Sequence, residues 1–151
     1  MLNTDQIKAL REETSISVAE CKKALEEAGG DMDKARALLR ERGAVMASKK
    51  ADRALGAGTV GSYLHANGAM GALVVLHSET DFVGGNPEFK AFAADLAMHV
   101  AAMMPPNREE FLGQPFVKDP SQTIDQLIQG AVQKFGERIE IGQFTRLDLT
   151  V

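Results

Sequence analysis

Hydrophobic residues in the first 43 positions recur every three to four residues, which is the period of an amphipathic helix. Capping residues and glycines divide this stretch into three short helices. We expect the first over Thr4–Glu13, the second from Ser17 to Gly29-Gly30, and the third from Asp31 to Gly43. The buried positions predicted by this pattern are Ile7, Leu10, Cys21, Ala24, Leu25, Ala28, Met32, Ala35, Leu38 and Leu39. Three helices of this length form a thin core, which favours a binding module over an enzyme domain.

The start of the second helix carries two local signals. Ser17 and Glu20 have the spacing of a capping box, in which Ser17 accepts a hydrogen bond from the Glu20 amide and Glu20 reaches back. Ile16 and Cys21 occupy the two positions of a hydrophobic staple. Both signals predict that the helix begins directly after Ser17.

The pattern changes after the third helix. Residues 44–57 are small, charged and weakly patterned, which indicates a linker with helical character. From residue 58 the hydrophobic period becomes two, and we expect strands over Thr59–His65 and Gly71–His77. The turn between them falls at Asn67-Gly68, since Asn-Gly is the strongest short hairpin signal. The second strand is apolar on both faces, which predicts a central place in its sheet.

Two further helices follow in the second half of the chain. Asn86-Pro87 has the pattern of an N-cap followed by proline in the first turn, and opens a helix that ends at Pro105-Pro106. The next helix begins at Ser121 or Thr123, because Thr123 and Gln126 have capping-box spacing, and it ends at Gly136.

The last segment predicts a strand and completes the fold class. Ile139–Leu149 has mostly apolar odd positions, and Gly142 marks a bulge. The predicted class is α+β: an N-terminal three-helix bundle, then a small three-stranded antiparallel sheet packed with helices. We expect domains at residues 1–43 and 58–151, with residues 44–57 as the linker.

Charge and composition narrow the class of function. The chain has 151 residues, of which 44% are hydrophobic and 25% charged, and its formal net charge is -4. The first 50 residues hold ten Lys and Arg against nine Asp and Glu, and the rest hold seven against twelve. Neither part has the basic excess that direct binding to nucleic acid normally needs. Without a signal peptide or an apolar run of about 20 residues, we expect a cytoplasmic protein that does not enter membranes.

The sequence offers only weak candidates for catalytic or metal-binding residues. His65, His77 and His99 are not at metal-ligand spacing, and we interpret them as surface or edge histidines. Cys21 falls at a helix-packing position and is interpreted as a core residue instead of a nucleophile. Since no glycine-rich loop follows a strand, a phosphate site is not indicated either. We expect no enzyme activity, no metal and no cofactor.

The segment Thr80-Asp81-Phe82-Val83 stands apart, because an aromatic residue follows a carboxylate directly after an apolar strand. Spacing alone favours Phe82 folded back into the core, with Asp81 as a turn or cap residue. The alternative is that Phe82 protrudes and fills a pocket of a partner, where the neighbouring carboxylate disturbs a metal or phosphate site.

This segment is one of several blocks that together resemble a known family. The blocks, in order, are Leu10–Thr14, Cys21–Leu25, Gly30–Ala35, Leu38–Gly43, Thr80–Val83, Gln114–Asp119 and Phe144–Leu147. The ordered set resembles elongation factor Ts, the exchange factor that releases GDP from the translation GTPase elongation factor Tu. The resemblance implies a ubiquitin-associated-like fold for residues 1–43 and a dimerisation-type core domain for 58–151. It implies elongation factor Tu, GDP-bound and nucleotide-free, as the partner.

The resemblance also implies roles for single residues. Asp81 and Phe82 match an intruding pair, whose phenyl ring wedges into an apolar pocket of the partner while the loop disturbs its magnesium site. Thr80 and Val83 complete that partner-insertion loop. The N-terminal domain docks on the partner's nucleotide-binding domain near the start of the second helix, through Val18, Ala19, Lys22 and Lys23.

The chain departs from the family pattern in three places. Gly84-Gly85 stands where members commonly have a small residue and a basic one, and we expect a more mobile loop. Ser15–Ala19 differs from a commoner glycine-rich stretch. Pro105–Gly113 is short where many members carry a long insertion and often a second core module, which leads us to hypothesise a homodimer. The competing function is a ubiquitin-associated-type adaptor or ribosome-associated protein without exchange activity.

Overall fold

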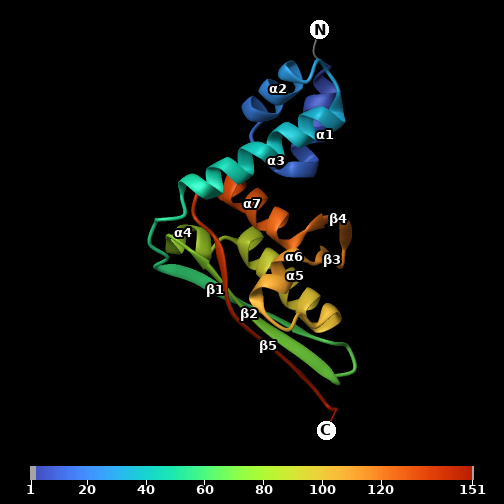
Figure 1. Ribbon diagram of the computed structural model, residues 1–151, viewed down its shortest axis with the longest axis vertical. Coiled ribbons are helices and arrows are strands. Elements are labelled where there is room, and N and C mark those ends of the chain that lie inside the picture. The colour runs from blue at the N-terminus through green and yellow to red at the C-terminus, as the bar shows by residue number, and fades with distance from the viewer. Residues whose placement is uncertain (1–2, 151) are drawn as a thin grey trace. The chain divides into compact units, whose positions relative to one another are not determined.

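The computed structural model describes residues 3–150, and Figure 1 traces the chain through its helices and strands. Contacts divide these residues into two compact units. One unit contains the chain up to Ala51 together with Gln129–Gly136, and the other contains Asp52–Ile128 together with the chain from Glu137 onward. Helices come first and a three-stranded antiparallel sheet follows, which confirms the α+β class. The domain limits 1–43 and 58–151 stay a prediction.

The first unit begins with three helices, α1 (Thr4–Thr14), α2 (Val18–Glu27) and α3 (Met32–Lys49). Their N-caps are Asn3, Ser17 and Asp31, and each cap side chain accepts a backbone amide of its helix. The caps at Ser17 and Asp31 agree with the predicted helix starts. The residues of the shared core are Leu10, Ile16, Cys21, Ala24, Leu25, Ala35 and Leu39, with Ile7, Ala28, Met32 and Leu38 packed around them. The predicted buried face is therefore confirmed.

The turn before α2 follows its local signals. The Ser17 hydroxyl oxygen accepts a hydrogen bond from the Glu20 amide at 3.3 Å, which is one half of the predicted capping box. Ile16 and Cys21 are both buried in the same core, as a hydrophobic staple requires. Gly29 and Gly30 end the helix with φ angles of 63° and 84°, in the left-handed region that favours glycine.

The predicted end of the third helix at Gly43 is wrong, because α3 continues to Lys49. Gly43 is helical and buried, and a side chain there would place its Cβ 3.0 Å from Gln133 Oε1 and 3.3 Å from the Gln129 carbonyl oxygen. The glycine thus allows a close helix contact and does not stop the helix. The residues after it include alanines and a methionine, which are good helix formers.

The sheet of the second unit has the order β1-β2-β5, with all neighbours antiparallel. Its strands are β1 (Ala57–Leu64), β2 (Met70–Ser78) and β5 (Glu140–Asp148). The apolar strand β2 is central, as expected. The turn joining β1 to β2 contains Asn67-Gly68, where Gly68 has φ 71°, so the predicted hairpin is confirmed.

A bulge in β5 changes which residues face the core. Val74 pairs with Phe144, whereas Leu76 pairs with Ile141, so β5 holds one extra residue at this point. The predicted bulge at Gly142 is therefore confirmed, and a Cβ there would lie 2.6 Å from His77 Nε2. Beyond the bulge the even positions face the core, and Leu147 turns to solvent.

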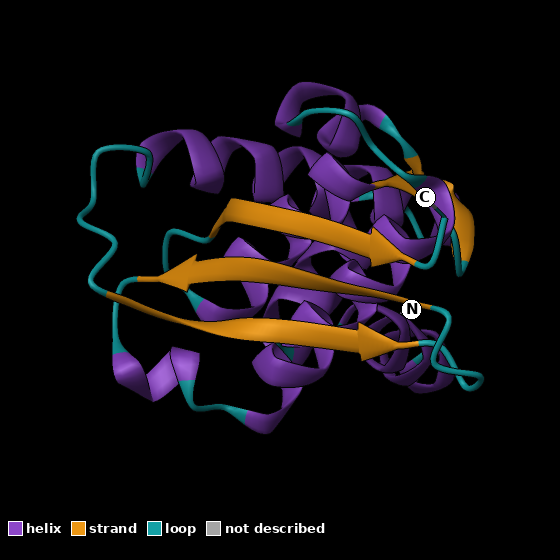
Figure 2. Cartoon of the chain, turned by 90° about the horizontal axis from the view of Figure 1, so that it is seen from below, coloured by secondary structure: helices purple, strands orange, loops and turns teal. Residues whose placement is uncertain are grey.

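Helix α5 (Pro87–Met103) covers one face of this sheet, while Figure 2 shows the three strands from the opposite, outer face. Asn86 caps the helix and Pro87 lies in its first turn, as expected. The helix lies so close to β1 that a Cβ on Gly61 would be 2.2 Å from the Ala93 carbonyl oxygen. The larger apolar residues buried between helix and sheet include Val74, Leu76, Phe89, Leu96 and Val100.

The segment after α5 contains elements that the hydrophobic pattern did not predict. These are α6 (Arg108–Gly113) and a small hairpin of β3 (Pro115–Phe116) and β4 (Asp119–Thr123). Helix α7 (Ile124–Phe135) follows with a complete capping box: Thr123 Oγ1 accepts from the Gln126 amide at 3.2 Å, and Gln126 Oε1 accepts from the Thr123 amide at 2.9 Å. Of the two predicted helix starts, Thr123 is confirmed, whereas Ser121 is wrong because it lies in β4.

Candidate functional site

The chain leaves β2 through a short helical turn, α4 (Asp81–Gly84). Thr80 is its N-cap: the hydroxyl oxygen accepts a hydrogen bond from the Val83 amide at 3.4 Å, and the carbonyl oxygen accepts from the Gly84 amide at 3.0 Å. The Gly85 amide then donates to the Asp81 carbonyl oxygen at 2.8 Å. The four residues of the predicted insertion loop therefore share one defined turn.

Phe82 protrudes from this turn. Its side chain is 93% exposed, whereas the next residue, Val83, is only 8% exposed. Asp81 is also exposed. Val83 anchors the turn to the core. The interpretation favoured by spacing alone, in which Phe82 folds back into the core, is wrong. A solvent-exposed phenyl ring beside a carboxylate forms a ready contact for another macromolecule.

The turn rests directly on the backbone of β1. Gly84 is buried, and a Cβ at this position would lie 2.9 Å from the carbonyl oxygen and 3.0 Å from the amide nitrogen of Gly58. Any side chain at residue 84 would therefore push α4 away from the strand. This packing role of Gly84 was not predicted from the sequence.

A glutamate from a distant part of the same unit holds the beginning of the turn. Glu137 Oε1 accepts hydrogen bonds from the amides of Glu79, at 3.1 Å, and Thr80, at 3.0 Å. Its second oxygen, Oε2, accepts from the Thr80 hydroxyl at 2.6 Å. One carboxylate thus makes three contacts with the two residues that precede α4.

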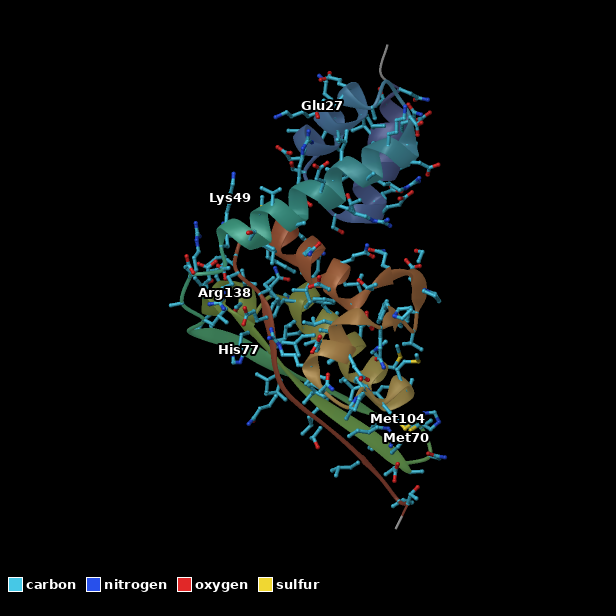
Figure 3. All side chains as sticks on the ribbon, in the orientation of Figure 1. Glu27, Lys49, Met70, His77, Met104 and Arg138 are labelled. Atoms are coloured by element: carbon cyan, nitrogen blue, oxygen red, sulfur yellow. The ribbon has the colours of Figure 1, made fainter. Side chains whose placement is uncertain are left out.

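Glu79 and Arg138 extend this network. Glu79 Oε2 accepts from the Arg138 amide at 2.6 Å, and the Arg138 guanidinium donates to the Arg53 carbonyl oxygen and to Glu140 Oε1, each at 2.6 Å. Figure 3 labels Arg138 just before β5, at the end of the sheet where α4 lies. These contacts join three segments that are distant in sequence.

The predicted docking residues of the N-terminal domain lie on the exposed side of α2. Val18 is 53% exposed, and Ala19, Lys22 and Lys23 are exposed as well. Since residues four apart are neighbours on a helix, Val18 lies beside Lys22 and Ala19 beside Lys23. The four residues form one continuous surface with an apolar and a basic part. They belong to the first unit, whereas Thr80–Val83 belongs to the second.

The other reactive residues are structural. Cys21 is buried, and burial raises the pKa of its thiol, so a thiolate nucleophile is not favoured. The interpretation of His99 as a surface or edge residue is wrong, because its side chain is fully buried. Its Nδ1 accepts from the Val117 amide at 3.1 Å, which leaves Nε2 to donate to Gln114 Oε1 at 2.8 Å. His99 therefore joins α5 to the segment around β3.

Residues 3–150 contain no group of three or more His, Cys, Asp or Glu side chains placed to hold a metal ion. Over the same range, no helix has the length and apolar character to cross a membrane.

Comparison with known proteins identifies the family to which this chain belongs. A family described as Elongation factor TS matches residues 3–110. The chain belongs to the elongation factor Ts family. Elongation factor Ts of Rubrobacter xylanophilus is 35% identical over 190 positions, covering 96% of this chain and 97% of the relative. Its counterpart in Acetivibrio thermocellus is 36% identical, covering 98% and 90%. The family consists of elongation factors of protein synthesis.

Relatives in the elongation factor Ts family differ from this chain in length. The alignment with the Rubrobacter protein spans 190 positions, but this chain has 151 residues, so at least 190 − 151 = 39 positions have no counterpart here. Elongation factor Ts of Trichlorobacter lovleyi is 45% identical over 139 positions, which are 92% of this chain and only 45% of that relative.

The family match over residues 3–110 includes both predicted contact regions, Val18–Lys23 and Thr80–Val83. Glu137 lies after that match, in the part of the chain where the similarity comes from alignment with single relatives, which cover 96% and 98% of this chain. The sequence offered no local signal for Glu137, because its partners are 57 and 58 residues away in the chain. Only the fold brings the glutamate to Thr80.

Proposed function

We propose that this chain is a guanine nucleotide exchange factor that promotes GDP release from elongation factor Tu during translation elongation. It inserts Thr80–Val83 near the partner's magnesium and nucleotide site. The observation that carries the proposal is the 93% exposure of Phe82 on a hydrogen-bonded turn, next to the exposed carboxylate of Asp81. Exposing a phenyl ring to water is unfavourable, so burying the Phe82 ring in an apolar pocket of a partner would stabilise the complex.

The mechanism is thermodynamic coupling between two ligands of the partner. A protein that binds the nucleotide-free form more tightly than the GDP-bound form lowers the affinity for GDP by the same factor. Filling a pocket with Phe82 supplies roughly 1.5–3 kcal/mol. This corresponds to a factor of about 10 to 100 in affinity. The chain makes and breaks no covalent bond in this role, and it needs no cofactor or metal of its own.

The exposed surface of α2 provides the second contact. Val18 and Ala19 give apolar area, and Lys22 and Lys23 give the positive charge that steers association with the nucleotide-binding domain of elongation factor Tu. The partner is a protein in the cytoplasm, and neither nucleic acid nor membrane takes part directly.

An adaptor or ribosome-associated protein without exchange activity remains the competing function. It would use the three-helix unit alone and would have no need for Phe82. One assay distinguishes the two functions. It measures the release of fluorescent GDP from elongation factor Tu after addition of excess unlabelled nucleotide. Exchange activity predicts at least tenfold faster release at micromolar concentrations of this chain. Unchanged release, with binding to elongation factor Tu intact, would favour the adaptor.

The protein acts as a homodimer through the outer face of its sheet. Strand register places Leu64, Gly71 and Leu147 in one row across this face, and the two leucines are 73% and 70% exposed. Two leucine ridges with a glycine groove between them can pack against the same row of a second copy related by a two-fold axis. The face is also hollowed by an apolar depression of about 360 Å³.

Light scattering tests the dimer. We expect twice the monomer mass at micromolar concentration for the wild type, and the monomer mass for Leu64→Ser combined with Leu147→Ser. A wild-type protein of monomer mass would exclude the dimer without affecting the proposed exchange activity.

A further inference from the structure

Glu137 completes a cap that the residues of α4 cannot make themselves. In a capping box, the third residue of the helix is Glu or Gln, and its side chain accepts the amide of the N-cap residue. In α4 the N-cap is Thr80 and the third residue is Val83, an apolar side chain that is buried. The Thr80 amide instead donates to Glu137 Oε1 at 3.0 Å. Glu137, from a distant segment, therefore takes the role that the third helix residue has in a capping box.

The same carboxylate also sets the orientation of the Thr80 hydroxyl. This hydroxyl donates a hydrogen bond to Glu137 Oε2 at 2.6 Å. Its lone pairs are then free to accept the Val83 amide, which lies 3.4 Å away. Glu137 thus acts on both ends of the turn, directly at Thr80 and through Thr80 at Val83.

Glu79 strengthens the arrangement by a reciprocal contact. The Glu137 side chain accepts the Glu79 amide at 3.1 Å, and the Glu79 side chain accepts the amide of Arg138, the residue after Glu137, at 2.6 Å. Each segment therefore offers a carboxylate to the backbone of the other. Two such crossed contacts fix the end of β2 against the start of β5.

Phe82 depends on this support more than a residue of an ordinary helix would. The turn α4 has four residues, and a helix this short has no stability of its own. The exposed Phe82 ring contributes little to holding the turn, so its direction is set by the backbone between Thr80 and Val83. A partner pocket gains most from a ring that is already oriented, because less conformational entropy is lost on binding.

We infer that Glu137 is a positioning residue for Phe82, which holds α4 in the conformation that presents the ring to elongation factor Tu. The inference rests on the proposed exchange function. Glu137 itself is not expected to contact the nucleotide or the magnesium ion of the partner.

A double-mutant cycle on GDP release tests this inference. We compare the wild type, Glu137→Ala, Phe82→Ala and the double variant. Glu137→Ala should slow release about five- to tenfold at limiting concentration, mainly by raising the concentration needed for half-maximal effect. The double variant should lie within about twofold of Phe82→Ala, because the glutamate acts only through the ring. A double variant slowed by the product of both single effects would overturn the inference.

Two further variants separate positioning from general damage. Glu137→Gln keeps one carbonyl oxygen that can accept both amides, so it should recover at least half of the lost activity on a logarithmic scale. Glu109→Ala removes the same charge from an exposed position of α6 and should retain wild-type activity. An inactive Glu109→Ala protein, or a fully active Glu137→Ala protein, would contradict the inference.

Amide hydrogen exchange of the isolated protein supplies a readout that does not depend on elongation factor Tu. In Glu137→Ala the amides of Thr80 and Val83 should exchange about tenfold faster, whereas that of Leu76 in β2 should keep its rate. If the wild type fails to accelerate GDP release, the proposed function falls and the positioning role falls with it. If release is accelerated but the Thr80 and Val83 amides are unaffected by the substitution, only the role of Glu137 is wrong.

Discussion

Gly84 lies against Gly58 so closely that a Cβ on Gly84 would be 2.9 Å from the Gly58 carbonyl oxygen. Gly84→Ala should therefore displace α4 and destabilise the protein by about 1–3 kcal/mol, the usual cost of overpacking. GDP release from elongation factor Tu should slow as well, since Phe82 is carried by the same turn. Urea unfolding and the release assay measure the two effects.

The matched control is Gly130→Ala in α7. Gly130 is helical, and apart from its chain neighbours and the backbone of its own helix no described atom lies within 4 Å of a Cβ there, so alanine should stabilise the helix by about 0.5–1 kcal/mol. Equal loss of stability in both variants would show that the contact with Gly58 is not the cause.

Ser15 ends α1 in the left-handed region, with φ 57°. This conformation costs a residue with a Cβ about 1–2 kcal/mol, and glycine adopts it freely. Ser15→Gly should therefore raise the free energy of unfolding by about 1 kcal/mol. Gly29 has a similar φ of 63° with open space around it, so Gly29→Ala should lower the free energy of unfolding by a similar amount. Changes of the same sign in the two variants would refute this account of the two caps.

Burial lowers the pKa of His99, so the unfolded chain binds a proton more readily than the folded one. The stability that this histidine contributes is complete above its unfolded pKa of about 6.5 and declines as the pH falls below that value. We expect the free energy of unfolding to decrease between pH 7 and 5.5, and His99→Gln to remove most of this slope. A wild-type protein with equal stability at both pH values would contradict the prediction.

Lys22 and Lys23 form the basic part of the exposed α2 surface. Reversing both charges to glutamate should slow association with elongation factor Tu about three- to tenfold, and more at low salt, because surface charges act mainly on the association rate. Lys49→Glu, at the end of α3, is the single-charge control. Association kinetics at two salt concentrations measure the effect, and a rate unchanged at low salt would remove these lysines from the contact.

Local signals in the sequence were sufficient for most element boundaries. Asn3, Ser17, Asp31 and Asn86 cap helices, and Asn67-Gly68 forms the hairpin turn, because each of these residues satisfies backbone groups within a few positions. Such contacts depend on neighbouring residues and are readable without the fold.

Contacts between distant segments could not be predicted in this way. Gly43 resembles a helix stop, but its contact with Gln129 and Gln133 keeps α3 continuous. The sequence pattern favours His99 as a surface residue, but in the fold Gln114 and the segment around β3 cover it. The same reason applies to the site: Phe82 was identified in the sequence, whereas the support from Glu137 depends on how β5 returns beside β2.

The central claim is that Phe82 drives nucleotide exchange, and stopped-flow release of fluorescent GDP from elongation factor Tu tests it most directly. Met104→Ala is the matched control, because Met104 is also a large exposed apolar residue of the second unit. We predict that Phe82→Ala slows release about 10- to 100-fold relative to the wild type, whereas Met104→Ala stays within about twofold. Equal release rates for Phe82→Ala and the wild type would contradict the claim.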